Sequence, residues 1–209
     1  MSRTWLITGV SSGFGNEMTK QLLETGDTVI GTVRSTNKVE ELVAKYPDTF
    51  DCQILDVTDI ERIHRFIPEM FKKHGRIDVV VNNAGYGLFG AAEELDYANI
   101  QKILDTNLTG PIMIIHDSLP YLRKQGGGRI IQLSSYGGQV AYAANSMYHA
   151  TKFGIEGFCE SVAQESGKVQ YRYYYRRAGR STHRVPVWQR SCSEPDAGVR
   201  SCTRLPEYA

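Results

Sequence analysis

Short apolar runs alternate with amphipathic stretches along residues 1–165. The runs are nearly continuous in Val, Ile and Leu, which is typical of strands that are buried on both faces of a sheet. They predict strands at 4–8, 28–33, 50–57, 77–85 and 127–135. The stretches between them carry apolar residues at helical spacing. They predict helices at 15–24, 38–45, 98–106 and 111–124, and a further helix that Thr58 caps and Gly75 ends.

Strands that alternate with helices along the chain are typical of an α/β fold. We therefore predict a doubly wound parallel sheet of the Rossmann type, a three-layer αβα arrangement. The composition changes once, between Glu165 and Val169, where a mixture of acids and bases gives way to arginine and tyrosine. We predict a nucleotide-binding and catalytic domain at 1–168. At 169–209 we expect an aberrant tail, disordered or poorly packed, so that the sheet lacks its last strands.

The overall composition argues against several classes of protein. The chain has 209 residues, 41% of them hydrophobic, which is enough for one packed core. A net charge of +1 gives the whole molecule no electrostatic preference for nucleic acid or a membrane surface. The N-terminus lacks the apolar region of a signal peptide, and no apolar run approaches the roughly 20 residues that span a bilayer. The four cysteines and five histidines show no metal-ligand spacing. We expect a cytoplasmic protein without a metal.

A glycine-rich segment follows the first predicted strand. The segment TGVSSGFG contains Gly9, Ser11, Ser12, Gly13, Phe14 and Gly15. Glycines at such a place let the chain turn sharply and let a pyrophosphate approach the helix N-terminus, where free N–H groups and the helix dipole favour an anion. The segment predicts a dinucleotide site. The alternative is a glycine turn that serves only to pack the strand against the helix.

The end of the second predicted strand indicates which dinucleotide is preferred. A site for NAD usually offers Asp or Glu there, to bind the 2′-hydroxyl of the ribose. The sequence instead reads Val33-Arg34-Ser35. An arginine can pair with a 2′-phosphate, so Arg34 predicts NADP(H) in preference to NAD(H). The alternative is an ordinary solvated arginine at the end of a strand.

Tyr148 and Lys152 stand four residues apart in the sequence YHATK and would share one face of a helix. A phenol in water loses its proton only at about pH 10, and a neighbouring ammonium ion favours the phenolate. Such a pair can act as a general acid and base. Ser135 lies upstream at the end of a predicted strand and can hold a substrate oxygen. A Tyr-x-x-x-Lys pair alone is a weak signal, because chance places it on many helices.

The motifs together are more specific than any one of them. They are TG-x-x-x-G-x-G from Thr8 to Gly15, NNAG at 82–85, Asn107, Ser135 and Tyr148-x-x-x-Lys152. In their order and spacing they resemble the short-chain dehydrogenase/reductase family over residues 3–165. The resemblance implies an oxidoreductase that transfers a hydride between NADP(H) and an alcohol or carbonyl substrate. It also implies a small-molecule partner and allows a homo-oligomer.

The resemblance assigns roles to the matching positions. Tyr148 would be the general acid and base, and Lys152 would favour its phenolate and bind the nicotinamide ribose. Ser135 would orient the substrate oxygen, and Asn107, at a break in a helix, would hold a water molecule of a proton relay. The remaining cofactor contacts would come from Asp56, Val57, Asn82, Ala84 and Gly85. Asn82 and Asn83 have a structural alternative, in which they tie neighbouring strands together. The loop 136–147 is mostly small and apolar, which predicts a hydrophobic alcohol or ketone.

The tail begins with the sequence VQYRYYYRRAGR, from Val169 to Arg180. Members of the family have a buried sixth strand and a Pro-Gly turn in this place. Tyrosine favours strands, but the arginines leave no apolar face for the centre of a parallel sheet. One interpretation is a basic-aromatic arm, Tyr171–Arg190, that binds nucleic acid from a Rossmann scaffold. Another is a chain that is inactive because its last strands are missing.

The genetic code gives a third interpretation of the tail. A tyrosine codon read one nucleotide later, before another tyrosine or an arginine, can encode only Ile or Thr. The shifted reading allows IVITIVEPGG for Tyr171–Arg180 and PRTGFRYGS for residues 181–189, and Trp188 before Gln189 forces a glycine. The first stretch is a buried strand with a Pro-Gly turn. We therefore interpret the residues from 167–170 onward as a frameshifted translation, attached to an NADP(H)-dependent oxidoreductase.

Overall fold

The computed structural model describes residues 2–165 and 169–174. The strands of this part form one parallel sheet in the order β3-β2-β1-β4-β5-β6. Their bounds are β1 (Thr4–Thr8), β2 (Thr28–Val33), β3 (Phe50–Ile54), β4 (Val79–Asn82), β5 (Gly128–Leu133) and β6 (Val169–Tyr174). The predicted doubly wound parallel sheet is confirmed.

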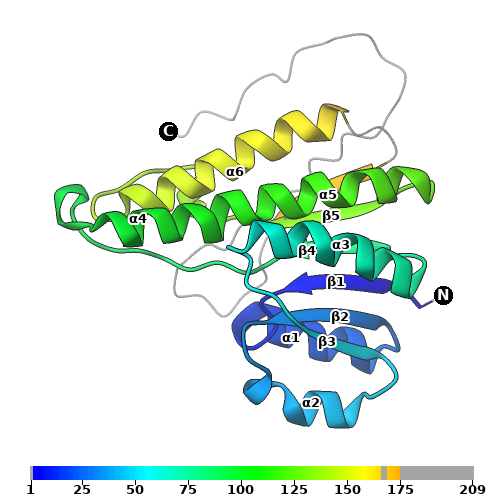
Figure 1. The fold of residues 1–209 in the computed structure, drawn as a ribbon. Helices are drawn as coiled ribbons and strands as arrows, with labels where there is room; N and C mark the ends of the chain where they lie inside the picture. The colour runs from blue at the N-terminus through cyan, green and yellow to red at the C-terminus, as the bar shows by residue number, and fades with distance from the viewer. Residues whose placement is uncertain (1, 166–168, 175–209) are drawn as a thin grey trace, which may run out of the picture.

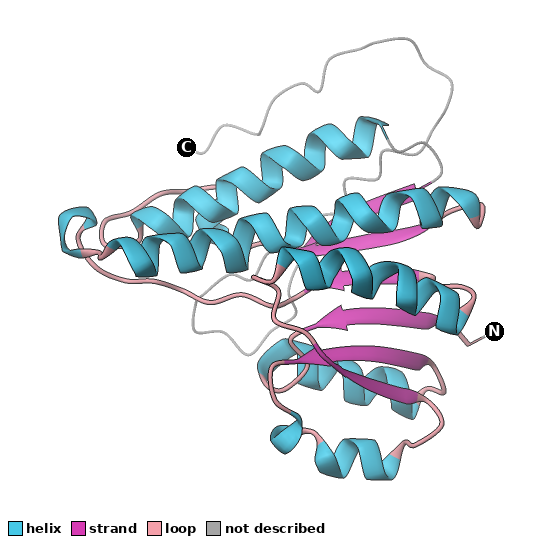
Figure 2. Ribbon diagram, viewed as in Figure 1, coloured by secondary structure: helices cyan, strands magenta, loops and turns pink. Residues whose placement is uncertain are grey.

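Helices cover both faces of the sheet, which makes the three layers that the sequence predicts (Figures 1 and 2). Their bounds are α1 (Gly13–Glu24), α2 (Glu40–Lys45), α3 (Ile60–His74), α4 (Tyr97–Leu104), α5 (Gly110–Lys124) and α6 (Ser146–Glu165). In Figure 1, α3, α5 and α6 lie along one face, and α1 and α2 lie on the other. One-turn 3-10 helices occur at Thr36–Lys38, Ala92–Glu94 and Tyr136–Gly138.

The hydrophobic core has two halves, one on each face of the sheet. Leu6 of β1 belongs to the half that packs against α3, α5 and α6, and its neighbour Ile7 belongs to the half beside α1 and α2. Both side chains are fully buried. Successive strand residues point to opposite faces, so a strand covered on both sides needs apolar residues at every position. This requirement explains the continuous apolar runs of the sequence.

Two local features refine the predicted helices. The helix after β3 is capped by Asp59, whose side chain accepts a hydrogen bond from Arg62 N at 2.9 Å. The expectation that Thr58 is the cap is wrong, because its own hydroxyl and N–H bind Asp56 instead. Between α4 and α5 the chain does not leave the helix, but makes a π-type turn at Asp105–Thr109. This turn is the break at which the sequence places Asn107.

The sixth strand differs from the expectation for the tail. Residues 169–174 pair with β5 in parallel register, from Gly128 opposite Val169 to Leu133 opposite Tyr174. The expectation that the sheet lacks a sixth strand is therefore wrong. Tyrosine favours strands, and an edge strand offers unpaired backbone groups to a further strand, which is consistent with this pairing. Residues 175–209 lie outside the described residues, and most of the basic-aromatic arm lies there with them.

The topology decides where a ligand can bind. All strands are parallel, so their carboxyl ends meet at one edge of the sheet. The strand order reverses between β1 and β4, and a crevice at such a switch point is the usual ligand site of an open α/β sheet. The segments that follow β1, β4 and β5 therefore surround the candidate site.

Candidate functional site

The glycine segment forms the tight turn between β1 and α1. Gly9 and Gly13 have φ angles of 72° and 56°, in the left-handed region that favours glycine. A Cβ atom at Gly15 would overlap the amide of Asn83 and the carbonyl oxygen of Gly9. Ser12, at the N-cap of α1, makes no side-chain capping bond, and the first turn contains no acid. A helix N-terminus without an acidic side chain or a side-chain cap is a usual place for an anion such as a pyrophosphate.

The segment NNAG is tied to this turn. Asn83 Nδ2 donates hydrogen bonds to the carbonyl oxygens of Thr8, at 2.8 Å, and Gly9, at 2.9 Å. The hydroxyl oxygen of Thr8 accepts from the N–H groups of Asn83 and Ala84, each at 3.0 Å. Asn82 Nδ2 donates to the carbonyl oxygen of Pro111 at 3.1 Å, which joins β4 to α5. Both asparagines thus have the structural contacts that the sequence leaves as an alternative.

The predicted adenosine contacts lie at the ends of β2 and β3. Arg34 is exposed and has no ion-pair partner within the described residues. The carbonyl oxygen of Thr32 accepts from Gly9 N at 3.0 Å, which brings the end of β2 to the glycine turn. Asp56 is exposed and accepts hydrogen bonds from Thr58, whereas the side chain of Val57 is buried in the core. Only the backbone of Val57 is left to contact a ligand.

Tyr148 and Lys152 lie on the first turns of α6, as their spacing predicts. Lys152 is only 7% exposed, and its Nζ lies 5.7 Å from the ring centroid of Tyr148. Nζ also donates a hydrogen bond to the carbonyl oxygen of Leu133 at 3.0 Å. Burial lowers the pKa of Lys152 to about 8, although the nearby carboxylate of Glu156 raises it. The ammonium group therefore loses its proton more readily than a lysine in water, and it lies beside the ring of Tyr148.

Asn107 and Gly85 lie against the same lysine. A Cβ atom at Gly85 would stand 3.1 Å from Oδ1 of Asn107 and 4.0 Å from Nζ of Lys152. Asn107 is buried and pairs with both backbone groups of Tyr86. Its Oδ1 accepts from Tyr86 N at 3.0 Å, and its Nδ2 donates to Tyr86 O at 2.7 Å. The π-type turn thus fixes the segment after β4 beside Lys152.

Ser135 lies in the turn after β5 that packs against α6. Its hydroxyl oxygen accepts a hydrogen bond from Gly137 N at 3.1 Å, which leaves the hydroxyl hydrogen to donate elsewhere. A Cβ atom at Gly137 would stand 3.1 Å from Cε1 of Tyr148, so this turn rests on the tyrosine ring. The structure therefore brings Ser135, Tyr148, Lys152 and Asn107 to one end of the sheet.

Two buried residues of α6 that sequence reasoning did not assign to the site also hold this turn. His149 Nδ1 is 2.7 Å from the carbonyl oxygen of Gly137, and its Nε2 accepts from Tyr142 N at 3.1 Å. Nδ1 is therefore the donor in this arrangement. Glu156 accepts from the side chains of Ser134 and Gln139. The signal in the sequence is an acid one helical turn after Lys152, next to the apolar positions Ile155 and Cys159 of the same helix.

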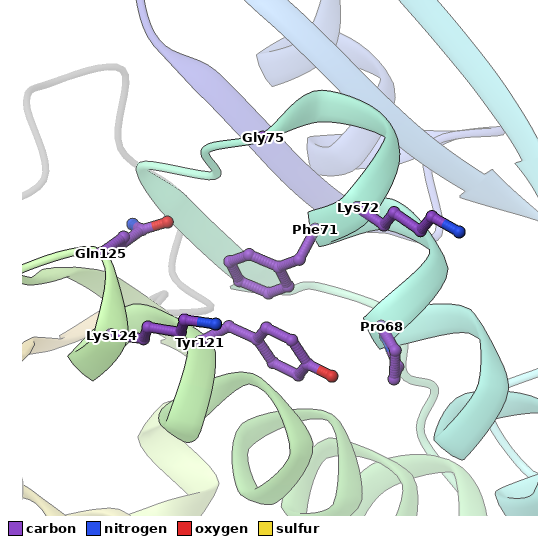
Figure 3. A pocket seen from close by; sticks show the side chains of 7 residues that line it. All are labelled: Pro68, Phe71, Lys72, Gly75, Tyr121, Lys124 and Gln125. Carbon is purple, nitrogen blue, oxygen red and sulfur yellow. The ribbon is translucent and has the colours of Figure 1, made fainter.

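A separate hollow of about 530 Å³ lies between α3 and α5 (Figure 3). The rings of Phe71 and Tyr121 stack in it, with centroids 4.8 Å apart. Lys72 and Lys124 stand at its sides, close to the ends of the two helices. None of the predicted site residues lines it. The ends of α3 and α5 lead into the start of β4 and β5, so this hollow lies away from the carboxyl edge of the sheet.

Comparison with known proteins agrees with these motifs. The sequence model of the family described as short chain dehydrogenase matches residues 3–172. The chain belongs to this family. It is 37% identical over 166 residues to oxidoreductase BOA17 of Botryotinia fuckeliana, covering 79% of this chain and 61% of that protein. It is 36% identical over 160 residues to a 3-ketodihydrosphingosine reductase of Bacteroides thetaiotaomicron, covering 77% and 57%. The chain thus spans less than two thirds of either relative.

Solved structures support the same conclusion for this short-chain dehydrogenase. A short-chain dehydrogenase from Streptomyces avermitilis superposes with a TM-score of 0.80 at 38% identity, covering 82% of this chain and 64% of that one. A metagenomic short-chain oxidoreductase in complex with NADP superposes with a TM-score of 0.78 at 27% identity, covering 84% and 82%. Within the described residues, no helix is long and apolar enough to cross a membrane. The same residues contain no cluster of metal-ligating side chains.

Proposed function

We propose that this chain transfers a hydride between NADP(H) and an alcohol or carbonyl group. The observation that carries the proposal is the cluster at the carboxyl edge of the sheet, where Lys152 lies beside the ring of Tyr148 and the turn with Ser135 packs on that ring. The glycine turn fits a dinucleotide, because Gly15 leaves no room for a side chain and the N-cap residue of α1, Ser12, makes no side-chain capping bond. Relatives named as reductases and as a retinol dehydrogenase support this class of reaction.

Each residue of the cluster has a definite task in this mechanism. The bound nicotinamide supplies the hydride chemistry. In the direction of reduction, the hydroxyl of Tyr148 gives its proton to the substrate oxygen. The Lys152 ammonium favours the phenolate that remains, and also binds the nicotinamide ribose. Ser135 donates its hydroxyl hydrogen to the same substrate oxygen, while its own oxygen accepts from Gly137 N. In the direction of oxidation the proton moves the other way.

NADP(H) is the cofactor that the residues fit best. Arg34 is exposed, has no ion-pair partner among the described residues, and follows the strand end that binds the glycine turn. A guanidinium group in this position can bind the 2′-phosphate of the adenosine ribose. Several of the similar structures contain NADP or NADPH. We assign Gly9, Ser11, Ser12, Gly13, Phe14, Gly15, Asp56, Val57, Asn82, Ala84 and Gly85 to the remaining cofactor contacts.

The loops around the site favour an apolar substrate. Phe89 is 73% exposed, and Tyr142 is 50% exposed. They belong to the segments after β4 and β5, which a hydrogen bond from Gly90 N to Ala144 O joins at 3.1 Å. Exposed aromatic side chains around a catalytic cluster offer an apolar surface to a substrate. We therefore propose a hydrophobic alcohol or ketone as the substrate. A cytoplasmic location is a separate part of the proposal. The alternative of a nucleic-acid-binding arm depends on residues 171–190, of which only 171–174 are described, and no observation favours it.

Substitution of the proposed acid tests this function. Tyr148→Phe should lower kcat for NADPH-dependent reduction of a long-chain alkyl ketone by about a hundredfold or more, because the proton donor is lost. The dissociation constant for NADPH, measured by cofactor fluorescence, should stay within about twofold, since the ring remains in place. Tyr97→Phe, in which the tyrosine is 91% exposed, is the matched control. A Tyr148→Phe protein that turns over like the wild type would refute the proposal.

A further inference from the structure

A buried carboxylate lies one helical turn beyond Lys152 and takes no part in the mechanism above. Glu156 is 6% exposed. Its Oε1 accepts a hydrogen bond from the hydroxyl of Ser134, and its Oε2 accepts one from Nε2 of Gln139. A protonated carboxyl group would have to donate from one of these oxygens. Two accepting oxygens therefore fit the ionised form.

The two donors flank Ser135 in the turn after β5. A Cβ atom at Gly138 would overlap Oε1 of Glu156, so the carboxylate rests directly on the backbone of this turn. Gly137, next to it, rests on the ring of Tyr148. Glycine at both positions is what allows the turn to approach α6 so closely. The segment 134–139 is thus held against α6 at two points, and Ser135 lies between the side chains that bind Glu156.

Glu156 lies between a positive and a negative side chain of the same helix. Lys152 lies one turn before it on α6, Glu160 lies one turn after it, and the buried thiol of Cys159 is close. The pKa of Glu156 is raised above its usual value, because the effect of burial outweighs the hydrogen bonds from Ser134 and Gln139, which lower it. Its negative charge raises the pKa of Lys152 against the opposing effect of burial. Removal of the carboxylate would therefore lower the pKa of Lys152 further and favour its neutral form.

We propose that Glu156 is a positioning residue that fixes the Ser135 turn against α6 and stabilises the ammonium form of Lys152. It does so through the hydroxyl of Ser134, the amide of Gln139 and the charge that it places one turn from Lys152. The inference rests on the proposed function, because it assumes that Ser135, Tyr148 and Lys152 act together. A shift of catalytic groups by about 1 Å can cost a hundredfold in rate, so a residue that fixes the turn affects kcat without contacting the substrate.

The first test, made in the full chain, distinguishes the effect of the charge of Glu156 from the effect of its size. Glu156→Gln keeps the size of the side chain and removes its charge. It should lower kcat by about tenfold or more, with KM for NADPH changed by less than about threefold. The high-pH limb of the kcat/KM profile, and the titration of Lys152 followed by NMR of labelled lysine, should both move to lower pH. A merely structural role would leave both titrations in place.

Two further variants test the hydrogen bond to the turn and provide a control for the loss of a negative charge. Ser134→Ala keeps the carboxylate but removes one of its bonds to the turn, and should lower kcat while the titration of Lys152 stays near its wild-type pH. Glu160→Gln, at an exposed acid one turn further along α6, is the matched control and should leave kcat within about twofold. If Glu156→Gln does not fold, Ser134→Ala decides the positioning role. Wild-type kcat in Ser134→Ala, or wild-type kcat and pH profile in a folded Glu156→Gln, would overturn the inference.

The outcome can be separated from that of the proposed function. If the wild type has no NADP(H)-dependent activity on alcohols or ketones, the proposed function fails. The NMR titration of Lys152 then still compares the wild type with Glu156→Gln. An unshifted titration in that pair contradicts the inference about Glu156 independently of turnover.

Discussion

The ammonium group of Lys152 donates a hydrogen bond to the main-chain oxygen of Leu133 at 3.0 Å, and this contact joins α6 to the end of β5. It places a cation where water is nearly excluded, since Lys152 is 7% exposed. Burial lowers its pKa from 10.5 to about 8. A lowered lysine pKa means that the charged side chain lowers the free energy of unfolding. The proposed catalytic role of Lys152 therefore comes with a loss of stability.

Lys152→Met should stabilise the protein at neutral pH and abolish turnover. The pKa shift corresponds to an unfavourable term on the order of 3 kcal/mol for the buried ammonium. Loss of the hydrogen bond to Leu133 offsets about 1 kcal/mol of it, which leaves a gain of about 2 kcal/mol. Denaturant unfolding of the apo proteins measures this difference, with Lys20→Met at an exposed position of α1 as the control.

The same pKa shift gives the gain a definite pH dependence. Below about pH 8 the lysine is charged in both the folded and the unfolded state, and its full cost is present. Between about 8 and 10.5 the unfolded chain holds more protons, so the stability of the wild type rises with pH relative to Lys152→Met. The difference between the two proteins should therefore shrink over this interval. A difference that is independent of pH would contradict the assignment of the cost to the buried charge.

Arg34→Asp should move the cofactor preference from NADPH toward NADH. Loss of a charge-assisted pair with the 2′-phosphate should weaken NADPH binding by about tenfold to a hundredfold. The new carboxylate can accept from the 2′-hydroxyl of NADH, so that affinity should rise. Cofactor fluorescence titrations measure both constants. Lys38→Asp makes the same change of charge in the next turn of the chain and should alter the preference much less. Equal effects of the two substitutions would assign the preference to the overall charge.

Asn107→Ala should destabilise the protein as well as lower its activity. The asparagine satisfies both backbone groups of Tyr86, at 3.0 and 2.7 Å, and is itself buried. The backbone groups of Tyr86 are partly buried, and loss of a hydrogen bond to such a group costs about 1 kcal/mol, so we expect a loss of about 2 kcal/mol for the two bonds together. Thermal unfolding checks the loss, with Asn99→Ala at an exposed site of α4 as the comparison. Unchanged stability with lost activity would instead favour a purely catalytic role in a proton relay.

Local sequence patterns predict the strands and the catalytic motifs of this protein, but few of the long-range contacts that hold the site together. The apolar runs located all five strands before the tail, and the break at Asn107 is the π-type turn. The predicted cap at Thr58 was wrong because Asp56, two residues earlier, binds its hydroxyl. The contacts of Glu156 are not predicted from the sequence, because its partners are 17 and 22 residues away and meet it only when the turn after β5 packs against α6. Contacts that depend on packing leave little trace in the local sequence.

The last prediction concerns the gene. The match to the family ends at residue 172, beside the change of composition after Glu165. If the tail is a frameshifted translation, the reading frame one nucleotide later should stay open through the codons of 171–189 and encode a strand of Ile, Thr and Val followed by Pro-Gly. The tyrosine codons force Ile or Thr, and Trp188 before Gln189 forces glycine, whereas the codon choice at the other positions leaves freedom. Resequencing of the locus reads that frame directly. Stop codons within it would refute the frameshift, whereas an open frame would justify expression of the corrected chain and comparison of its NADPH turnover with that of the present one.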